Sequence, residues 1–311
     1  MTELYFAQIS DIHLSTQGNI FDMLSGQAAD FLSGVVADLN RQPDLDFVLI
    51  TGDLFNEATQ AELALFQQAM RTLQKPTYVI PGNHDRREPD RSDGLTLRQF
   101  AHYFNPQIQP RLAAGDDQLG YWSIPLKPEI QLIGLDSIKE DDWGGKIGPA
   151  QMAWLKTELE AQTDKLVILA CHHPLHQLAP IDRHPDWSNF VCDNGAELLT
   201  LFDSYPQLKL VLTGHHHLTR ADLLGSRLHL ACPALAVYPC AYRTIRLSRL
   251  LNGQWRIEWQ TQPATGDDIV AEARRRMEHA WQEAGFTPEF VAAHVGIAAG
   301  SDRDQAGQII L

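Results

Sequence analysis

Five short segments of this 311-residue chain place side chains that bind metal ions directly after apolar runs that predict buried strands. In an open α/β sheet the carboxyl ends of the strands lie at one edge, where such side chains can meet. Carboxylate, amide and imidazole groups gathered there would bind transition metal ions. The segments are Asp11-Ile12-His13, Gly52-Asp53, Gly82-Asn83-His84-Asp85, His172-His173-Pro174 and Gly214-His215-His216-His217.

The first two segments supply carboxylates. Asp11 and His13 are two residues apart, so on an extended chain their side chains would project to the same side and could hold one ion. Asp53 follows Gly52, which permits a tight bend after its strand. A carboxylate can bridge two ions through its two oxygen atoms, whereas an imidazole cannot. Either motif alone is also typical of a surface turn or a helix cap, so the prediction depends on all five segments.

The third segment adds a neutral ligand and a proton donor. Asn83 offers a carbonyl oxygen, which suits a hard divalent ion. His84 is set to face the reacting group and could donate a proton to it. Asp85 could orient its neighbours. An Asn-type turn after a strand is the alternative, but the combination of four residues is rare enough to favour a metal site.

The last two segments concentrate histidines at two strand ends. One of His172 and His173 should be a ligand, because alternation along an extended chain sends the other to the opposite side. By the same alternation His215 and His217 share a side, and His216 faces away. The expected ligands are therefore two aspartates, one asparagine and four histidines.

This ligand set predicts a pair of ions that share one bridging carboxylate and keep open positions for water and substrate. Oxygen and imidazole ligands suit iron or manganese, and zinc or cobalt would also fit. The absence of cysteine from the set argues against a structural zinc site. Two ions roughly 3.5–4 Å apart are the usual apparatus for hydrolysing phosphate esters, because they lower the pKa of a shared water and offset charge on the phosphate.

The remaining pattern predicts the elements that must position these residues. Apolar runs alternate with helical patterns, which indicates an α/β sandwich. Thr59 is a plausible N-cap and Pro149 suits the first turn of a helix. After Gly214 three strands follow without helices, which suggests one antiparallel sheet closing the domain. The predicted strands are 4–9, 46–50, 77–80, 130–135, 166–170, 208–212, 227–231, 242–247 and 255–260, and the predicted helices are 26–40, 59–73, 149–161, 196–204, 267–284 and 287–294.

Two regions stand apart from this alternation. Residues 1–262 are expected to form the domain that carries the site, and 263–311 a helical extension with a poorly ordered tail. The irregular segment 86–120 follows a metal motif directly, so it is either a lid or specificity loop or a solvated loop with a short helix. Within it Arg86 and Arg87 could bind a substrate phosphate, and His176 lies near enough to the fourth motif to do the same.

Composition limits the partners. The formal net charge is −14, which disfavours a nucleic acid duplex or an anionic membrane as a broad partner. It does not exclude a small anionic substrate, because bound metal ions reverse the local field. The four cysteines form no CxxC pair, and neither a signal peptide nor a membrane-spanning run is visible. We therefore expect a cytoplasmic protein with buried free thiols, while a homo-oligomer is left open.

These motifs, in this order from Asp11 to His217, resemble the calcineurin-like metallophosphoesterases, whose pattern is DxH, GD, GNH[DE], a lone His and GHxH. The resemblance implies a four-layer αββα sandwich of two mixed sheets flanked by helices, with His84 assisting the leaving group or the transition-state oxygen. His172 is then the ligand, because the family uses the first His of HHP. The resemblance assigns the first ion to Asp11, His13, Asp53 and His217, and the second to Asp53, Asn83, His172 and His215.

Within that family the chain is most similar to bacterial class III cyclic-nucleotide and glycerophosphodiester phosphodiesterases. This implies hydrolysis of a small phosphodiester by in-line attack of a metal-bound hydroxide. A phosphomonoesterase or nucleotide pyrophosphatase with the same two ions is the main alternative, and a non-catalytic scaffold and a DNA nuclease are more distant ones. The Ser/Thr protein phosphatases are disfavoured, because they carry GDxVDRG where residues 52–57 read GDLFNE.

Overall fold

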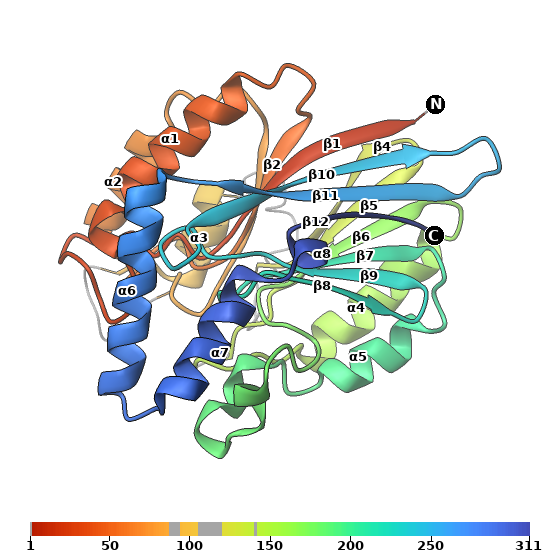
Figure 1. The fold of residues 1–311 in the computed structure, drawn as a ribbon. Coiled ribbons are helices and arrows are strands. Elements are labelled where there is room, and N and C mark those ends of the chain that lie inside the picture. Colours follow the sequence, from red (N-terminus) through yellow and green to blue (C-terminus); the bar gives the residue numbers. More distant parts are fainter. Residues whose placement is uncertain (1, 87–93, 105–119, 140–141) are drawn as a thin grey trace.

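The computed structural model describes residues 2–86, 94–104, 120–139 and 142–311. Two six-stranded mixed sheets pack face to face, and helices cover their outer surfaces (Figure 1). The expected four-layer αββα sandwich is confirmed. Among the described residues no helix is both long enough and apolar enough to cross a membrane.

The first sheet carries three of the five predicted motifs. Its strands β1, β2 and β3 run parallel, and β10 to β12 continue it in antiparallel fashion. The strand order is β12 (Ala306–Ile310), β11 (Trp255–Pro263), β10 (Ala241–Arg249), β1 (Glu3–Ile9), β2 (Phe47–Thr51) and β3 (Thr77–Ile80).

The second sheet carries the two histidine motifs. Its four central strands are parallel, and an antiparallel strand closes each edge. The order is β4 (Trp122–Lys127), β5 (Ile130–Gly134), β6 (Leu166–Ala170), β7 (Leu208–Thr213), β9 (Arg227–Ala231) and β8 (Arg220–Leu224).

Three apolar layers hold the sandwich together. One lies between the sheets, one between the first sheet and helices α1 and α2, and one between the second sheet and helices α4 and α5. Alternate residues of a strand face opposite sides, so Phe6 packs between the sheets while Ala7 packs against the helices. The helices are α1 (Ala28–Asn40), α2 (Gln60–Met70), α3 (Leu97–Phe104), α4 (Pro149–Ala161), α5 (Gly195–Phe202), α6 (Asp267–Glu283), α7 (Pro288–Ala299) and α8 (Asp302–Gln305).

Local sequence signals explain several helix starts. Thr59 accepts a hydrogen bond from the Glu62 amide while the Glu62 carboxylate accepts one from the Thr59 amide, which makes a capping box at the start of α2. Pro149 occupies the first turn of α4, where its missing N–H costs nothing. Both predicted helix starts are confirmed.

Two expectations for the C-terminal third are wrong. The strands after Gly214 do not form one antiparallel sheet, because β9 joins the second sheet parallel to β7 while β10 and β11 join the first. The tail is not poorly ordered either: α8 begins with Ser301 as its cap, and β12 adds an edge strand to β11. All four cysteines are buried and free, as expected.

Candidate metal centre

The predicted ligands gather where β1, β2, β3, β6 and β7 end, at the edge shared by the two sheets. Five of them have a left-handed backbone, with φ between 46° and 66°. Such a backbone costs a residue other than glycine about 1 kcal/mol or more and is concentrated at functional sites. The motif pairs are therefore aimed by tight turns and not by alternation along an extended chain. The five residues are Asp11, His13, Asp53, His215 and His217.

The first group of ligands comes from the ends of β1 and β7. Donor atoms of Asp11, His13 and His217 all lie within 4.8 Å of one another. Nε2 of His13 is 3.0 Å from Nε2 of His217, and the latter is 3.5 Å from Oδ1 of Asp11. These separations are close to the roughly 3.3 Å expected between two ligands that each lie about 2.0–2.1 Å from one ion.

The second group comes from β2, β6 and β7, with the loop after β3. Asp53, His172 and His215 again place donor atoms within 4.8 Å of one another. Nε2 of His172 is 3.2 Å from the side-chain oxygen of Asn83. Nε2 of His215 is buried and has no hydrogen-bond partner among the described residues. A buried nitrogen without a partner is costly unless a ligand satisfies it, so this donor set fits a metal ion.

Asp53 lies at the junction of the two groups. Its Oδ2 is 3.6 Å from Nε2 of His13 and 3.2 Å from Nε2 of His172. Its Oδ1 accepts a hydrogen bond from the backbone amide of His84 at 2.9 Å, which fixes the orientation of the carboxylate. One carboxylate is thus in reach of both ligand groups, as a bridging ligand requires.

Hydrogen bonds behind the ligands hold them in place. Nδ1 of His172 lies 2.7 Å from the Thr51 carbonyl, so the Nδ1 proton is donated there and Nε2 faces Asp53 and Asn83. The His215 amide donates to both carboxylate oxygens of Asp11, at 3.0 and 3.1 Å. Because each bond joins one sheet to the other, the ligand positions depend on the packing of the whole sandwich.

Asp85 ties together two of the loops that carry ligands. It is fully buried, and its carboxylate accepts hydrogen bonds from the amides of Leu54, Phe55 and Gly82 at 2.7, 3.2 and 2.8 Å. Burial and then the charge of Asp53 raise the pKa of Asp85, while these N–H donors oppose that rise. The side chain therefore couples the turn after β2 to the turn after β3.

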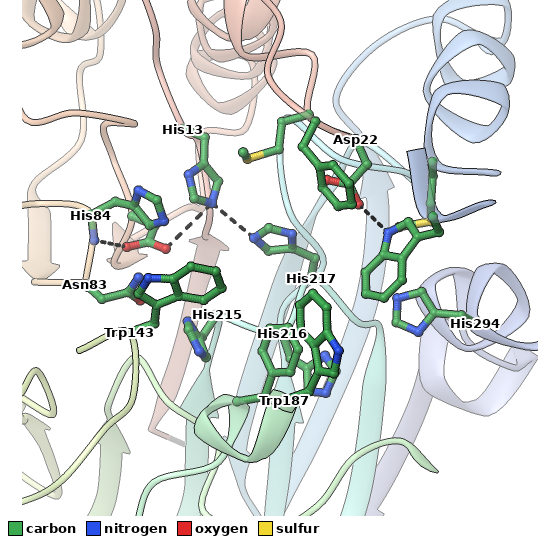
Figure 2. A pocket seen from close by; sticks show the side chains of 16 residues that line it. His13, Asp22, Asn83, His84, Trp143, Trp187, His215, His216, His217 and His294 are labelled. Carbon is green, nitrogen blue, oxygen red and sulfur yellow. Dashed lines mark hydrogen bonds and ion pairs between the residues drawn. The ribbon is translucent and has the colours of Figure 1, made fainter. Parts of the chain in front are cut away.

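His84 is oriented but not enclosed. Its Nδ1 lies 2.9 Å from the Asn56 carbonyl, which leaves Nε2 for a substrate atom. Its ring is 4.9 Å from that of His13 at an interplanar angle of 82°, and Figure 2 shows it beside Asn83 at the cavity that His13 and His217 also line. This is a suitable position for a proton donor to a leaving oxygen.

The neighbouring histidines of each motif point elsewhere. Nε2 of His173 donates its proton to the Trp143 carbonyl at 2.8 Å, and Nδ1 lies 2.8 Å from the Ser137 hydroxyl. His216 pairs with Asp182 and stacks on Phe190. In both histidine motifs, a candidate ligand is thus followed by a histidine that contacts other residues.

Burial and neighbouring charges shift the pKa values of the histidines at this site. Burial alone would lower the pKa of His172, but the Asp53 charge outweighs it and raises that pKa to about 9. Burial lowers the pKa of His13 to about 3 and that of His215 well below its ordinary value. Neutral imidazole is the form that binds metal ions, so His13 and His215 are ready as ligands, whereas an ion would have to displace a proton from His172.

A cavity of about 390 Å³ opens beside the ligands. This falls within the roughly 300–1,000 Å³ of small-molecule sites. Candidate ligands and His84 form one part of its lining, and side chains that sequence reasoning did not single out, most of them aromatic or apolar, form the rest (Figure 2). These residues come from separate segments of the chain and carry no shared motif, so no local signal could have found them. They include Phe21, Asp22, Met23, Trp143, Trp187, Phe190, Met277, Trp281 and His294.

The residues proposed to bind substrate are less well placed. Arg86 is half-buried and is not among the described residues that line the cavity, and Arg87 lies outside the described residues. His176 lies 3.3 Å from Oδ2 of Asp222 and its ring is 4.8 Å from that of His229. These two partners are directly paired residues of β8 and β9, so His176 belongs to a separate cluster.

Comparison with known proteins identifies a phosphoesterase. The family model for calcineurin-like phosphoesterases matches residues 4–218, and the chain belongs to that family. It is a hydrolytic phosphoesterase of a family that depends on two metal ions. The recognition made from the motifs is confirmed.

Individual proteins of known name are similar to this chain in sequence or in fold. A 3′,5′-cyclic-nucleotide phosphodiesterase of Nostoc sp. is 29% identical over 215 residues, which cover 68% of this chain and 70% of that protein. A probable glycerophosphodiester phosphodiesterase of Arcobacter nitrofigilis is 30% identical over 213 residues, again 68% and 70%. The crystal structure of a dimetal phosphatase from Danio rerio matches with a TM-score of 0.68 at 14% identity, covering 84% of this chain and 96% of that one, and supports the fold.

Proposed function

We propose that this protein is a phosphodiesterase that uses two metal ions to hydrolyse small phosphodiesters. The observation that carries the proposal is the position of Asp53, whose Oδ2 lies 3.6 Å from His13 and 3.2 Å from His172. A single ion would not need a carboxylate between two separate ligand groups. The relatives named as cyclic-nucleotide and glycerophosphodiester phosphodiesterases support the same class of substrate.

In this proposal, seven residues bind the two ions and His84 transfers a proton. Asp11, His13, Asp53 and His217 would hold the first ion, and Asp53, Asn83, His172 and His215 the second. When bound, the two ions supply a hydroxide nucleophile near neutral pH and neutralise charge on the phosphate oxygens. His84, whose Nδ1 proton is held by the Asn56 carbonyl, presents Nε2 toward the cavity. There it would stabilise the transferring oxygen or protonate the leaving group.

Iron or manganese suits the ligand set best, and zinc or cobalt would also fit. Histidine nitrogen together with carboxylate and amide oxygen is borderline between hard and soft ligands. No cysteine is among the donors, and the free cysteines are buried. Metal analysis of the purified protein, with reconstitution by each ion in turn, would identify the pair that gives the highest kcat/KM.

The cavity favours a diester over a dianionic monoester. None of the described residues that line it is a lysine or an arginine, and its wall opposite the ligands is largely aromatic. A second negative charge on a monoester would find no cationic partner there beyond the ions. A diester carries one charge and brings a second organic group that can contact the wall.

One observation favours the alternative function of a monoesterase or nucleotide pyrophosphatase. Arg86 follows the third motif, and its buried Nη2 has no hydrogen-bond partner among the described residues. A guanidinium in that condition would suit a dianionic phosphate. A substrate panel of bis(p-nitrophenyl) phosphate, p-nitrophenyl phosphate and a nucleoside diphosphate separates the two functions, because each predicts a different preferred substrate.

The assignment of the ligands is tested by substitution. Asp53→Ala and Asn83→Ala should reduce hydrolysis of bis(p-nitrophenyl) phosphate with Mn²⁺ to background while circular dichroism stays that of the wild type. Asp44→Ala is the matched control, since Asp44 is exposed and lies in the turn before β2. Full activity in either ligand variant would refute the assignment.

A further inference from the structure

A continuous row of aromatic rings begins at the candidate metal ligand His215 and runs along the cavity. The His215 and Phe190 ring centroids are 5.5 Å apart, and Phe190 stacks on Trp187 at 5.6 Å with an interplanar angle of 8°. Trp187 contacts Trp281 at 5.4 Å, and Trp281 contacts Phe21 at 5.9 Å. We call Phe190, Trp187, Trp281 and Phe21 the aromatic wall.

The wall faces the same cavity as the ligands. All four of its residues line the cavity, together with His13, Asp53 and His84. Figure 2 shows Trp187 and His215 at the lower side of this space, with His84 and His13 at its other side. A phosphate held at the ligands would therefore direct one of its ester groups along the wall.

From this geometry we propose that the aromatic wall is a subsite that binds a planar aromatic group on the leaving alcohol of the substrate. The inference rests on the proposed phosphodiesterase function and adds a residue-level basis for substrate choice. Flat rings stack on flat rings in offset or tilted arrangements, which aliphatic groups cannot match. A glycerol group, with hydroxyls to satisfy, would lose hydration against this wall without gaining hydrogen bonds.

The wall suits a neutral ring better than a quaternary ammonium group. Asp22 contacts the wall, but its Oδ2 accepts a hydrogen bond from Nε1 of Trp281 at 2.9 Å, and burial raises its pKa. His294 packs on Trp281 at 4.5 Å, and burial lowers its pKa to about 4, so it is uncharged at neutral pH. The Asp22 carboxylate is thus engaged by a ring of the wall itself.

Part of the subsite comes from outside the segment that the family model matches. Trp281 and Met277 lie on α6 and His294 on α7, beyond residue 218. Helices α6 and α7 pack onto the loops after β6 and β7 through Leu178 and Leu218. The C-terminal helices therefore complete, through Trp281, a wall whose other three rings lie within the matched segment.

The test compares KM for two classes of diester in matched variants. Trp187 is half-buried, so Trp187→Leu and Trp187→Phe should fold. Trp154→Leu is the control, because Trp154 is half-buried on α4 against Tyr121 and is not among the described residues that line the cavity. The substrates are 3′,5′-cyclic AMP, glycerophosphoglycerol and glycerophosphocholine, each with Mn²⁺.

Loss of the indole should raise KM for cyclic AMP roughly tenfold, the equivalent of about 1.4 kcal/mol, with kcat and the KM of glycerophosphoglycerol changed less than twofold. Trp187→Phe should restore most of the affinity. An equal rise for all substrates, or a selective loss of glycerophosphocholine, would overturn the proposal.

A binding measurement separates this inference from the proposed function. Adenosine carries the ring without a phosphate, so its affinity, followed by tryptophan fluorescence, does not depend on turnover. If no diester is hydrolysed but adenosine binds to the wild type and not to Trp187→Leu, the phosphodiesterase proposal fails and the subsite stands. If diesters are hydrolysed but adenosine binds both proteins equally or neither, the subsite fails alone.

Discussion

Replacement of Asp85 tests a residue that supports the metal centre without binding an ion. The Asp85 carboxylate accepts three backbone N–H groups, from Leu54, Phe55 and Gly82, and is fully buried. It binds no metal in the proposed ligand set. Its loss should therefore act through the two turns that carry Asp53 and the Asn83-His84 pair.

The expected loss in the free energy of unfolding follows from the number of N–H donors left unpaired. Asp85→Ala exposes three buried N–H groups to an empty space, and each costs about 1–3 kcal/mol, so the variant should lose at least about 3 kcal/mol. Asp85→Asn keeps one oxygen for Leu54 and Phe55 but turns its NH₂ toward the Gly82 amide, so it should lose about 1–3 kcal/mol. Against a total of about 5–15 kcal/mol, both are large.

Urea denaturation in the presence of a chelator measures these losses without the contribution of bound metal. In parallel, kcat/KM at saturating Mn²⁺ should fall by roughly 100-fold in Asp85→Asn, because a displacement of about 1 Å at reacting groups has that effect. Wild-type stability and activity in Asp85→Asn would refute the reasoning. That result would mean that burial keeps Asp85 protonated and that a neutral amide replaces it without loss.

Three further changes test other parts of the structure. Gly82→Ala would place a methyl group against the amide and carboxylate of Asp53, so activity and metal content should fall at least tenfold, whereas Gly296→Ala, on an open helix surface, should be neutral in the same assays. Thr59→Ala removes the capping box of α2 and should cost about 1 kcal/mol in urea denaturation, with kcat unchanged. Burial would raise the pKa of Asp222, but His176 and Arg220 outweigh it and lower that pKa to about 2; Asp222→Asn should therefore cost about 1 kcal/mol at pH 7, after allowance for solvent screening, and this difference should shrink as pH falls from about 4 toward 2.

The candidate metal ligands could be singled out from the sequence because each follows a recognisable strand and belongs to a short motif. Strand existence was equally clear, and β3, β6 and β9 begin and end where the apolar runs do. The pairing of the strands could not be predicted, since the apolar pattern of β9 is the same whether it pairs with β7 or β10. Residues 306–310 alternate between exposed and half-buried positions, so their pairing with β11 left little hydrophobic signal.

The aromatic wall shows why part of a site escapes such reasoning. Trp187 and Trp281 belong to different segments and meet only because α6 packs beside the loop after β6. Neither residue lies in a motif, and a tryptophan in an amphipathic helix is ordinary core material. Only the three-dimensional arrangement distinguishes a ring that lines a cavity from one that fills the core.

The left-handed turns explain why the ligands need so much of the chain to support them. Five unfavourable backbone conformations persist only where surrounding bonds leave no alternative. The amides of Asp11 and His13 donate to the carbonyls of Gly52 and Asp53, and the amide of Gly214 donates to the carbonyl of His172. Each bond links neighbouring strand ends within one sheet, while the His215 and His172 bonds link the two sheets. The positions of the candidate ligands are therefore fixed by backbone and side-chain bonds of the sandwich itself.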